Sequence, residues 1–215
     1  MHEMPGPLRA LLCNWRMKIG LSSTLAVVYW TGYYFIERHL WRTPVRLDLS
    51  PIDRWIGFSP GWVWGYQSIY LMLPLPFLAT TRRDLRRYAI GFILMMAAAF
   101  ACFILFPIRG PRPAIAPMSG AYGFLARYDL PFNNLPSLHL AVATYSACVA
   151  IRVTHGKLRR MLKLLLPPWV LLIGYAALAI KQHYAIDLPP GILLGWLAQR
   201  IAWRTSRDPR ERRGI

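Results

Sequence analysis

The sequence predicts an all-α membrane protein, a polytopic bundle of six transmembrane helices. Apolar residues make up 55% of the 215 residues and charged residues only 16%, which leaves too few polar groups to cover a water-facing surface. This composition excludes an ordinary soluble enzyme. A spanning helix needs about 20 mostly apolar residues, and six stretches of this kind are separated by charged segments. They cover residues 19–36, 61–80, 88–106, 138–153, 162–180 and 188–203.

The six stretches differ in how regular a helix they should form. The first carries four serine and threonine residues, and the fourth and sixth are short. The second should bend, because Pro74 and Pro76 lack the N–H group that helical hydrogen bonding needs. In the sixth, Gly191 and Gly195 form a GxxxG pattern. Close packing within the bundle is favoured over dimerisation as the purpose of that pattern.

Basic residues predict how the helices are oriented in the membrane. An even number of spans places both chain ends on one side, and more than two thirds of the 26 Lys and Arg residues fall on that side. Because basic segments stay in the cytoplasm, we expect both termini there. The net charge of +17 then reflects orientation and attraction to membrane lipids, so nucleic acid is not an expected partner. The chain divides into a cytoplasmic N-terminal segment (1–18), a six-span membrane domain (19–203) and a basic cytoplasmic tail (204–215).

Three polar segments fall at the opposite, outer boundary under this topology: residues 106–113, 133–139 and 181–187. Together they bring two histidines, one carboxylate, one serine and three basic residues to one face. Ionisable groups at membrane depth are costly and therefore indicate a functional site. Attack on a phosphate is the chemistry that requires this combination of groups.

His183 and Asp187 are the candidate nucleophile and its activating carboxylate. Four residues apart, they lie on one face if their segment is helical. A carboxylate that accepts a hydrogen bond from one imidazole nitrogen leaves the other nitrogen with a lone pair for attack. The alternative is that Asp187 only caps the sixth helix and that His183 is an interfacial side chain.

His139 begins the fourth predicted helix and is the candidate acid and base. The free N–H groups and positive dipole end of that helix suit a phosphate oxygen, to which Ser137 adds a hydroxyl or serves only as the N-cap. With an ordinary pKa near 6.5, His139 can protonate a departing alkoxide and later accept a proton from water. The alternative is a histidine whose ring is satisfied by a buried carbonyl group.

Three basic side chains are candidates for binding the phosphate. Arg109 and Arg112 can hold phosphoryl oxygens and balance charge in the transition state, since the planar guanidinium suits bidentate contact. Lys181 can add a third positive charge. Taken alone, each is also typical of a side chain that reaches toward lipid headgroups.

At these residues the sequence resembles the type-2 phosphatidic acid phosphatase superfamily of integral-membrane phosphatases and phosphotransferases. Arg112 and Pro113 resemble the Arg-Pro of its first motif, and residues 136–139 (PSLH) resemble its Pro-Ser-Gly-His. His183 with Asp187 resembles the His-x-x-x-Asp that ends the third motif. The likeness extends from the third predicted span to the sixth.

The resemblance implies a role for each of these residues. His183 would form a phosphohistidine that Asp187 orients, and His139 would protonate the leaving group. Arg112 and Ser137 would hold the phosphate, with no metal ion and no cofactor.

The sequence also departs from the family pattern. Leu105 and Ala177 stand where a lysine and an arginine are usual, so Arg109 and Lys181 are candidate replacements, and Leu138 replaces the glycine of the second motif. PSLH followed by KQHYAID resembles the branch that contains inositol-phosphorylceramide and sphingomyelin synthases, which pass a phospho-headgroup to an alcohol.

The leading functional hypothesis is a metal-independent lipid phosphatase whose active site faces the periplasm or lumen. Its substrate would be a phosphorylated lipid of the phosphatidate, polyprenyl diphosphate or sphingolipid type. A phosphotransferase that uses the same residues is the alternative. A non-enzymatic lipid or anion carrier is disfavoured, because the inner halves of the predicted spans hold almost no ionisable groups. Compactness favours a bacterial inner membrane, and the oligomeric state is left open.

Overall fold

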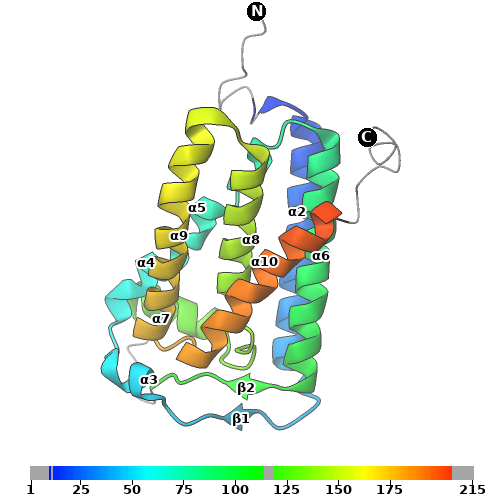
Figure 1. Cartoon of the computed structure of the whole chain (residues 1–215). Helices are drawn as coiled ribbons and strands as arrows, with labels where there is room; N and C mark the ends of the chain where they lie inside the picture. Colours follow the sequence, from blue (N-terminus) through cyan, green and yellow to red (C-terminus); the bar gives the residue numbers. More distant parts are fainter. Residues whose placement is uncertain (1–9, 11, 114–118, 205–215) are drawn as a thin grey trace, which may run out of the picture.

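Helices dominate the computed structural model, which describes residues 10, 12–113 and 119–204. Successive long segments run in opposite directions along the bundle, and α10 crosses its neighbours at a tilt (Figure 1). The all-α expectation is confirmed in its main point. The long helices are α2 (Trp15–Arg38), α6 (Arg82–Leu105), α8 (Leu138–Val153), α9 (Gly156–Ala179) and α10 (Leu188–Arg204).

The second apolar stretch forms short pieces rather than one helix. Its break begins at Ser68, before the two prolines, where the hydroxyl donates to the Gly65 carbonyl oxygen at 2.6 Å. Such side-chain bonding to the backbone competes with regular helix. Pro74 then caps a turn of 3-10 helix and Pro76 lies in its first turn, where a missing N–H group is tolerated. The pieces are η1 (Pro60–Trp62), α4 (Val63–Gln67), α5 (Ile69–Met72) and η2 (Leu75–Leu78).

Helix α8 occupies the centre of the bundle. Residues on all of its faces are buried, and alanine and serine allow neighbouring helices to come close. A helix that is apolar all round belongs in such a position. It packs against α6, α9, α10 and η2. Because α8 is contacted from several sides, the position of its first turn is fixed from several directions.

The contact between α8 and α10 depends on the two glycines of the GxxxG pattern. A Cβ atom at Gly191 would collide with the carbonyl oxygen of Ser137, and one at Gly195 with that of Ala141. The pattern therefore packs two helices of the same chain closely, as the sequence favoured.

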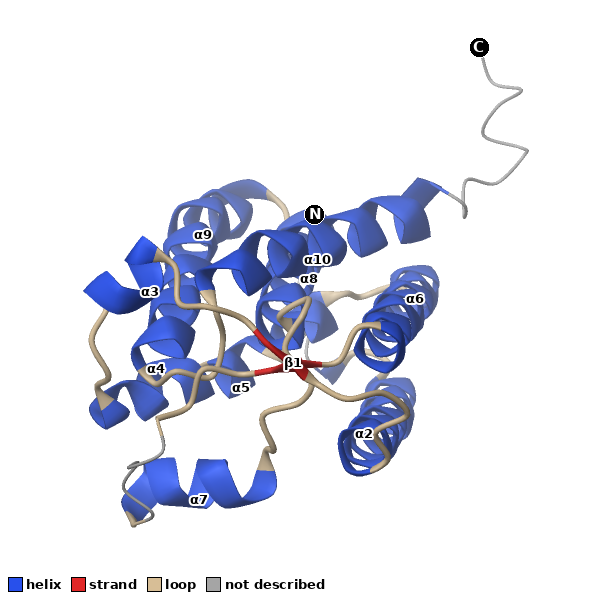
Figure 2. Ribbon diagram, turned by 90° about the horizontal axis from the view of Figure 1, so that it is seen from below, coloured by secondary structure: helices blue, strands red, loops and turns tan. Residues whose placement is uncertain are grey.

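One end of the bundle carries both short strands and several short helices. Strand β1 (Val45–Arg46) pairs in parallel with β2 (Ile108–Arg109), a feature that the all-α expectation overlooked. Seen from this end, the strands lie between α2 and α6 on one side and α3 and α4 on the other (Figure 2). The same end holds α3 (Pro51–Trp55), α7 (Gly120–Tyr128) and η3 (Ala185–Asp187).

Length and composition identify fewer membrane-crossing helices than the sequence predicts. Among the described residues, α6 and α9 are long and apolar enough to cross a membrane, and α8 is a shorter apolar helix. The number of spans and the side of the termini therefore stay predictions. Most of the predicted N-terminal segment and nearly all of the basic tail lie outside the described residues.

Candidate active site

His183 and Asp187 are in contact at the end of the bundle where α8 and α10 begin. His183 Nδ1 lies 3.4 Å from Asp187 Oδ2, and the same oxygen accepts a hydrogen bond from the Tyr184 N–H at 2.8 Å. The segment between them is a turn followed by η3, not the α-helix that we assumed. The His183 side chain is 7% exposed and that of Asp187 is 0% exposed. Asp187 thus caps η3 and also contacts the histidine.

His139 lies at the start of the central helix and contacts a tyrosine that the sequence did not single out. Its Nδ1 is 2.9 Å from the Tyr66 hydroxyl, and the two rings stack with centroids 3.9 Å apart. Nε2 of His139 is buried and has no hydrogen-bond partner among the described residues. The ring is close enough to His183 for an electrostatic interaction between them. The contact with Tyr66 therefore leaves Nε2 available for another group.

The first residues of α8 are joined to the segment of the catalytic candidates. The Ser137 N–H donates to the Asp187 carbonyl oxygen at 3.0 Å. The Ser137 hydroxyl caps α8 by accepting from the Leu140 N–H at 3.4 Å. Backbone hydrogen bonding thus holds two of the three motif segments in register.

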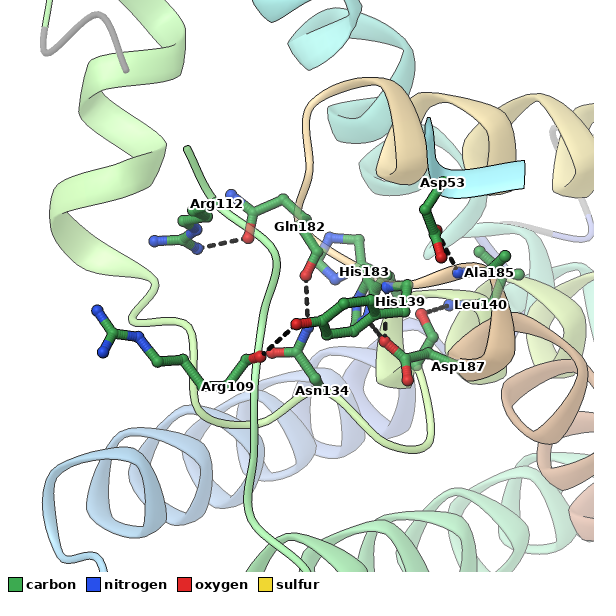
Figure 3. A network of polar contacts seen from close by, with 12 residues as sticks. Asp53, Arg109, Arg112, Asn134, His139, Leu140, Gln182, His183, Ala185 and Asp187 are labelled. Atoms are coloured by element: carbon green, nitrogen blue, oxygen red, sulfur yellow. Dashed lines mark hydrogen bonds and ion pairs between the residues drawn. The ribbon is translucent and has the colours of Figure 1, made fainter. Parts of the chain in front are cut away.

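Arg112 reaches the same region through Gln182. Its guanidinium contacts the Gln182 side-chain oxygen and lies 3.6 Å from Asp129 Oδ2. Gln182 also receives, on its backbone oxygen, a 2.6 Å hydrogen bond from the Asn134 side chain. Figure 3 shows the Arg112 guanidinium directed toward the Gln182 side chain. The three predicted motif segments are therefore connected by side chains as well as by backbone.

Arg109 takes a different direction from Arg112. Its guanidinium points away from the two histidines in Figure 3, and the residue is exposed. Its backbone oxygen accepts a 3.1 Å hydrogen bond from the Tyr184 hydroxyl. The structure thus joins the Arg109 backbone to residues 181–187, while the Arg109 guanidinium faces outward.

The placement of Lys181 argues against its expected role as a phosphate-binding cation. The buried ammonium group donates to the backbone oxygens of Asp53 and Ile56, at 2.5 and 2.6 Å. Burial lowers the pKa of this group, and the nearby Asp53 carboxylate opposes that shift. Lys181 therefore holds α3 and the residue after it, Ile56, next to residues 181–187. Its φ of 58° marks the turn that leaves α9.

Several residues of this network were missed by sequence reasoning. Tyr66 was read only as part of a predicted span, and Asp53 and Asp129 lie outside the three polar segments. Asp53 contacts residues 181–187 directly, since its Oδ1 accepts a hydrogen bond from the Ala185 N–H at 2.8 Å. Gln182 lies within one of the predicted segments but was given no role. Among the described residues, no group of three or more His, Cys, Asp or Glu side chains could hold a metal ion.

The fold and this site define a helical protein with a histidine–aspartate pair, a second histidine and an arginine at one end, a set suited to phosphoryl transfer. The sequence model of the PAP2 superfamily matches residues 86–211, more than half of the chain, and the chain belongs to that superfamily. Its members are phosphatases or related phosphotransferases that act on phosphorylated lipids. Searches among curated proteins and solved structures found no match.

Proposed function

We propose that this protein is an integral-membrane lipid-phosphate phosphatase that acts through a phosphohistidine on His183. The observation that carries the proposal is the gathering of His183, Asp187 and His139 at one end of the bundle. These residues come from two separate segments, and each histidine keeps Nδ1 engaged by a neighbour. Nε2 is then the reactive atom on both rings.

In the first step, His183 attacks the phosphorus atom. The Nδ1–H of His183 donates to Asp187, so Nε2 has the lone pair that forms the N–P bond. The P–O bond to the lipid breaks as His139 gives its Nε2 proton to the departing oxygen. Arg112 and the N–H groups at the start of α8 hold the phosphoryl oxygens. The His183–Asp187 contact is long for a hydrogen bond, as catalytic contacts often are before substrate binds.

In the second step, water replaces the lipid alcohol. His139, now neutral, takes a proton from water through Nε2 while the water oxygen forms a bond to phosphorus. The N–P bond to His183 breaks and inorganic phosphate leaves. The Tyr66 hydroxyl supports both steps by accepting from Nδ1–H of His139, which keeps Nε2 as the proton-carrying atom. An alcohol in place of water gives the phosphotransferase reaction from the same intermediate.

Surface composition supports a position in a membrane. Large apolar side chains are exposed on every outer segment of the bundle, including Val27 (65%), Leu71 (64%), Leu171 (65%) and Leu193 (52%). Such continuous apolar exposure is typical of a lipid-facing surface. The basic residues that begin α6 and α9 lie at the end opposite the site (Figure 1).

The proposed topology follows from the exposed apolar side chains and from the position of the basic residues at one end of the bundle. Six segments would cross the membrane with both termini in the cytoplasm, because the basic end stays inside. The site would then face the periplasm of a bacterial inner membrane. Phosphatidate, a polyprenyl diphosphate and a sphingolipid phosphate are the substrate types to compare.

The test is phosphate release by the purified protein in detergent with a chelator present. The three lipid phosphates are supplied with and without alcohols, and products are identified by mass spectrometry. We expect His183→Ala to lose turnover by more than about 1,000-fold and His139→Ala by roughly 100- to 10,000-fold. His155→Ala is the matched control, because this exposed histidine precedes α9 at the opposite end. Full turnover in His183→Ala would exclude the mechanism, and lipid movement across vesicles without chemical change would favour a carrier.

A further inference from the structure

An apolar cavity of about 210 Å³ extends from His139 into the bundle. It lies between α2, α5, η2, α6 and α8, and His139 forms part of its wall. Leu25, Ile69 and Leu73 are among the apolar side chains that line it. The cavity therefore connects the proposed acid and base with a space suited to hydrocarbon.

Aromatic side chains line the part of the cavity formed by η2 and α6. Phe77 and Tyr88 meet edge to face with ring centroids 5.6 Å apart, and Phe92 lies against Tyr88 at 5.9 Å. These residues come from η2 and the first turns of α6, near the end of the bundle opposite the site. On the outer side, Trp30 (40% exposed) and Tyr70 (48% exposed) also line the cavity, which opens it toward the surroundings.

We propose that this cavity binds one hydrocarbon chain of the lipid phosphate whose phosphoryl group reacts at His183. This proposal rests on the proposed function and adds a binding site that limits the length of the lipid's hydrocarbon chain. The lining residues of α2 run from Ser22 to Trp30, which is about 12 Å along a helix. A chain that enters beside His139 would fill this length and stop at Phe77 and Tyr88. Its alcohol oxygen would then leave next to the ring that protonates it.

Most of this wall lies outside the region that the PAP2 superfamily model matches. The lining residues of α2, α5 and η2 precede residue 86, whereas only Tyr88, Phe92, His139 and Val142 fall within residues 86–211. The proposed reacting groups thus lie within the matched region, while most of the surface for the hydrocarbon lies before it. The residues of α2, α5 and η2 that line the cavity would then determine which lipid tails the protein prefers.

Ala26→Trp tests the cavity without disturbing the core. Ala26 lines the cavity yet is exposed, so a larger side chain can fill the space from outside. Val27→Trp is the matched control, because this neighbour on α2 is 65% exposed and does not line the cavity. The substrates are n-alkyl phosphates of increasing length, each used as a monomer in a fixed amount of detergent.

For the unmodified protein, kcat/KM should rise about fourfold per added methylene until the cavity is full, since each buried methylene contributes about that factor. Ala26→Trp should reach its plateau at a shorter chain and lose at least tenfold on long chains, with butyl phosphate unaffected. Val27→Trp should follow the unmodified protein. Equal effects of the two variants, or no dependence on chain length, would overturn the cavity proposal while leaving the proposed function intact.

Binding of n-alkylphosphonates, measured by calorimetry, separates the two proposals further because it needs no turnover. Affinity should rise with chain length in the unmodified protein and rise less in Ala26→Trp. If affinity depends on chain length in this way but none of the phosphates is hydrolysed, the proposed function is wrong and the cavity proposal is supported. If affinity does not depend on chain length, the cavity proposal is wrong.

Discussion

Replacing Gly191 by alanine should damage the active site through the packing of α10 on α8. The added methyl carbon would overlap the Ser137 carbonyl oxygen and approach the Cβ atoms of Ser137 and Leu140 to 3.2 and 3.3 Å. These are backbone or short side-chain atoms that cannot rotate away, so α10 has to move. Overpacking of this kind costs about 1–3 kcal/mol of unfolding free energy.

The same movement should also lower turnover. Asp187 precedes α10 directly, and its carbonyl oxygen accepts from the Ser137 N–H. A shift of α10 by about 1 Å would separate the His183–Asp187 pair from His139, and a displacement of that size costs on the order of 100-fold in rate. Substrate binding in the cavity between α2 and α5 should change little.

Thermal unfolding and phosphate release, measured on the same detergent preparation, check this prediction. Gly20→Ala is the control, because a Cβ atom at Gly20 meets nothing within 4 Å. Alanine in a helix interior should even stabilise α2 by about 0.5–1 kcal/mol. The reasoning is refuted if Gly191→Ala unfolds and turns over like the unmodified protein. Reduced stability with unchanged turnover per folded molecule would refute the link between helix packing and the site.

Four further substitutions test individual side chains of the site. Tyr66→Phe keeps the stacked ring but removes the hydrogen bond to His139, so kcat/KM should fall about two- to tenfold and the pH–rate profile should shift; an unchanged profile would contradict the positioning role. Lys181→Met should lower the unfolding free energy by about 1.5–3 kcal/mol, because charged hydrogen bonds to two carbonyls are lost. A raised KM with unchanged stability would instead restore its phosphate-binding role. Arg112→Ala should raise KM by at least tenfold and Arg109→Ala by much less, and equal effects would show that both guanidinium groups bind phosphate.

Local pattern accounts for most of the helices but not for their ends. The prediction for α8, residues 138–153, agrees with the structure at both ends, because a polar cap and a basic residue bound its apolar run. Helix α9 begins at Gly156 rather than at 162, since Lys157 and its basic neighbours continue the helix outside the apolar window. Helix α6 likewise begins at Arg82, where Thr81 caps it by accepting from the Asp84 N–H at 3.0 Å.

The site was only partly predictable because its supporting contacts are long-range. His183 with Asp187 and the start of α8 could be proposed from spacing, since each motif is local. The Tyr66–His139 contact joins residues 73 positions apart, and Lys181 contacts carbonyl groups more than 120 positions away. Such pairs leave no periodicity in the sequence. Lys181 shows the consequence, because its position next to His183 suggested a phosphate ligand, whereas its ammonium group donates to the carbonyl oxygens of Asp53 and Ile56.

The central position of α8 has a consequence for how activity should be compared between preparations. None of the large apolar side chains exposed on the described part of the chain belongs to α8, so the helix that carries His139 in its first turn has little contact with the surrounding medium. Bilayer thickness, headgroup composition and detergent would act on the outer helices first. A change of rate between micelles and nanodiscs would then report on how lipid reaches the protein, while the arrangement of the two imidazoles stays the same.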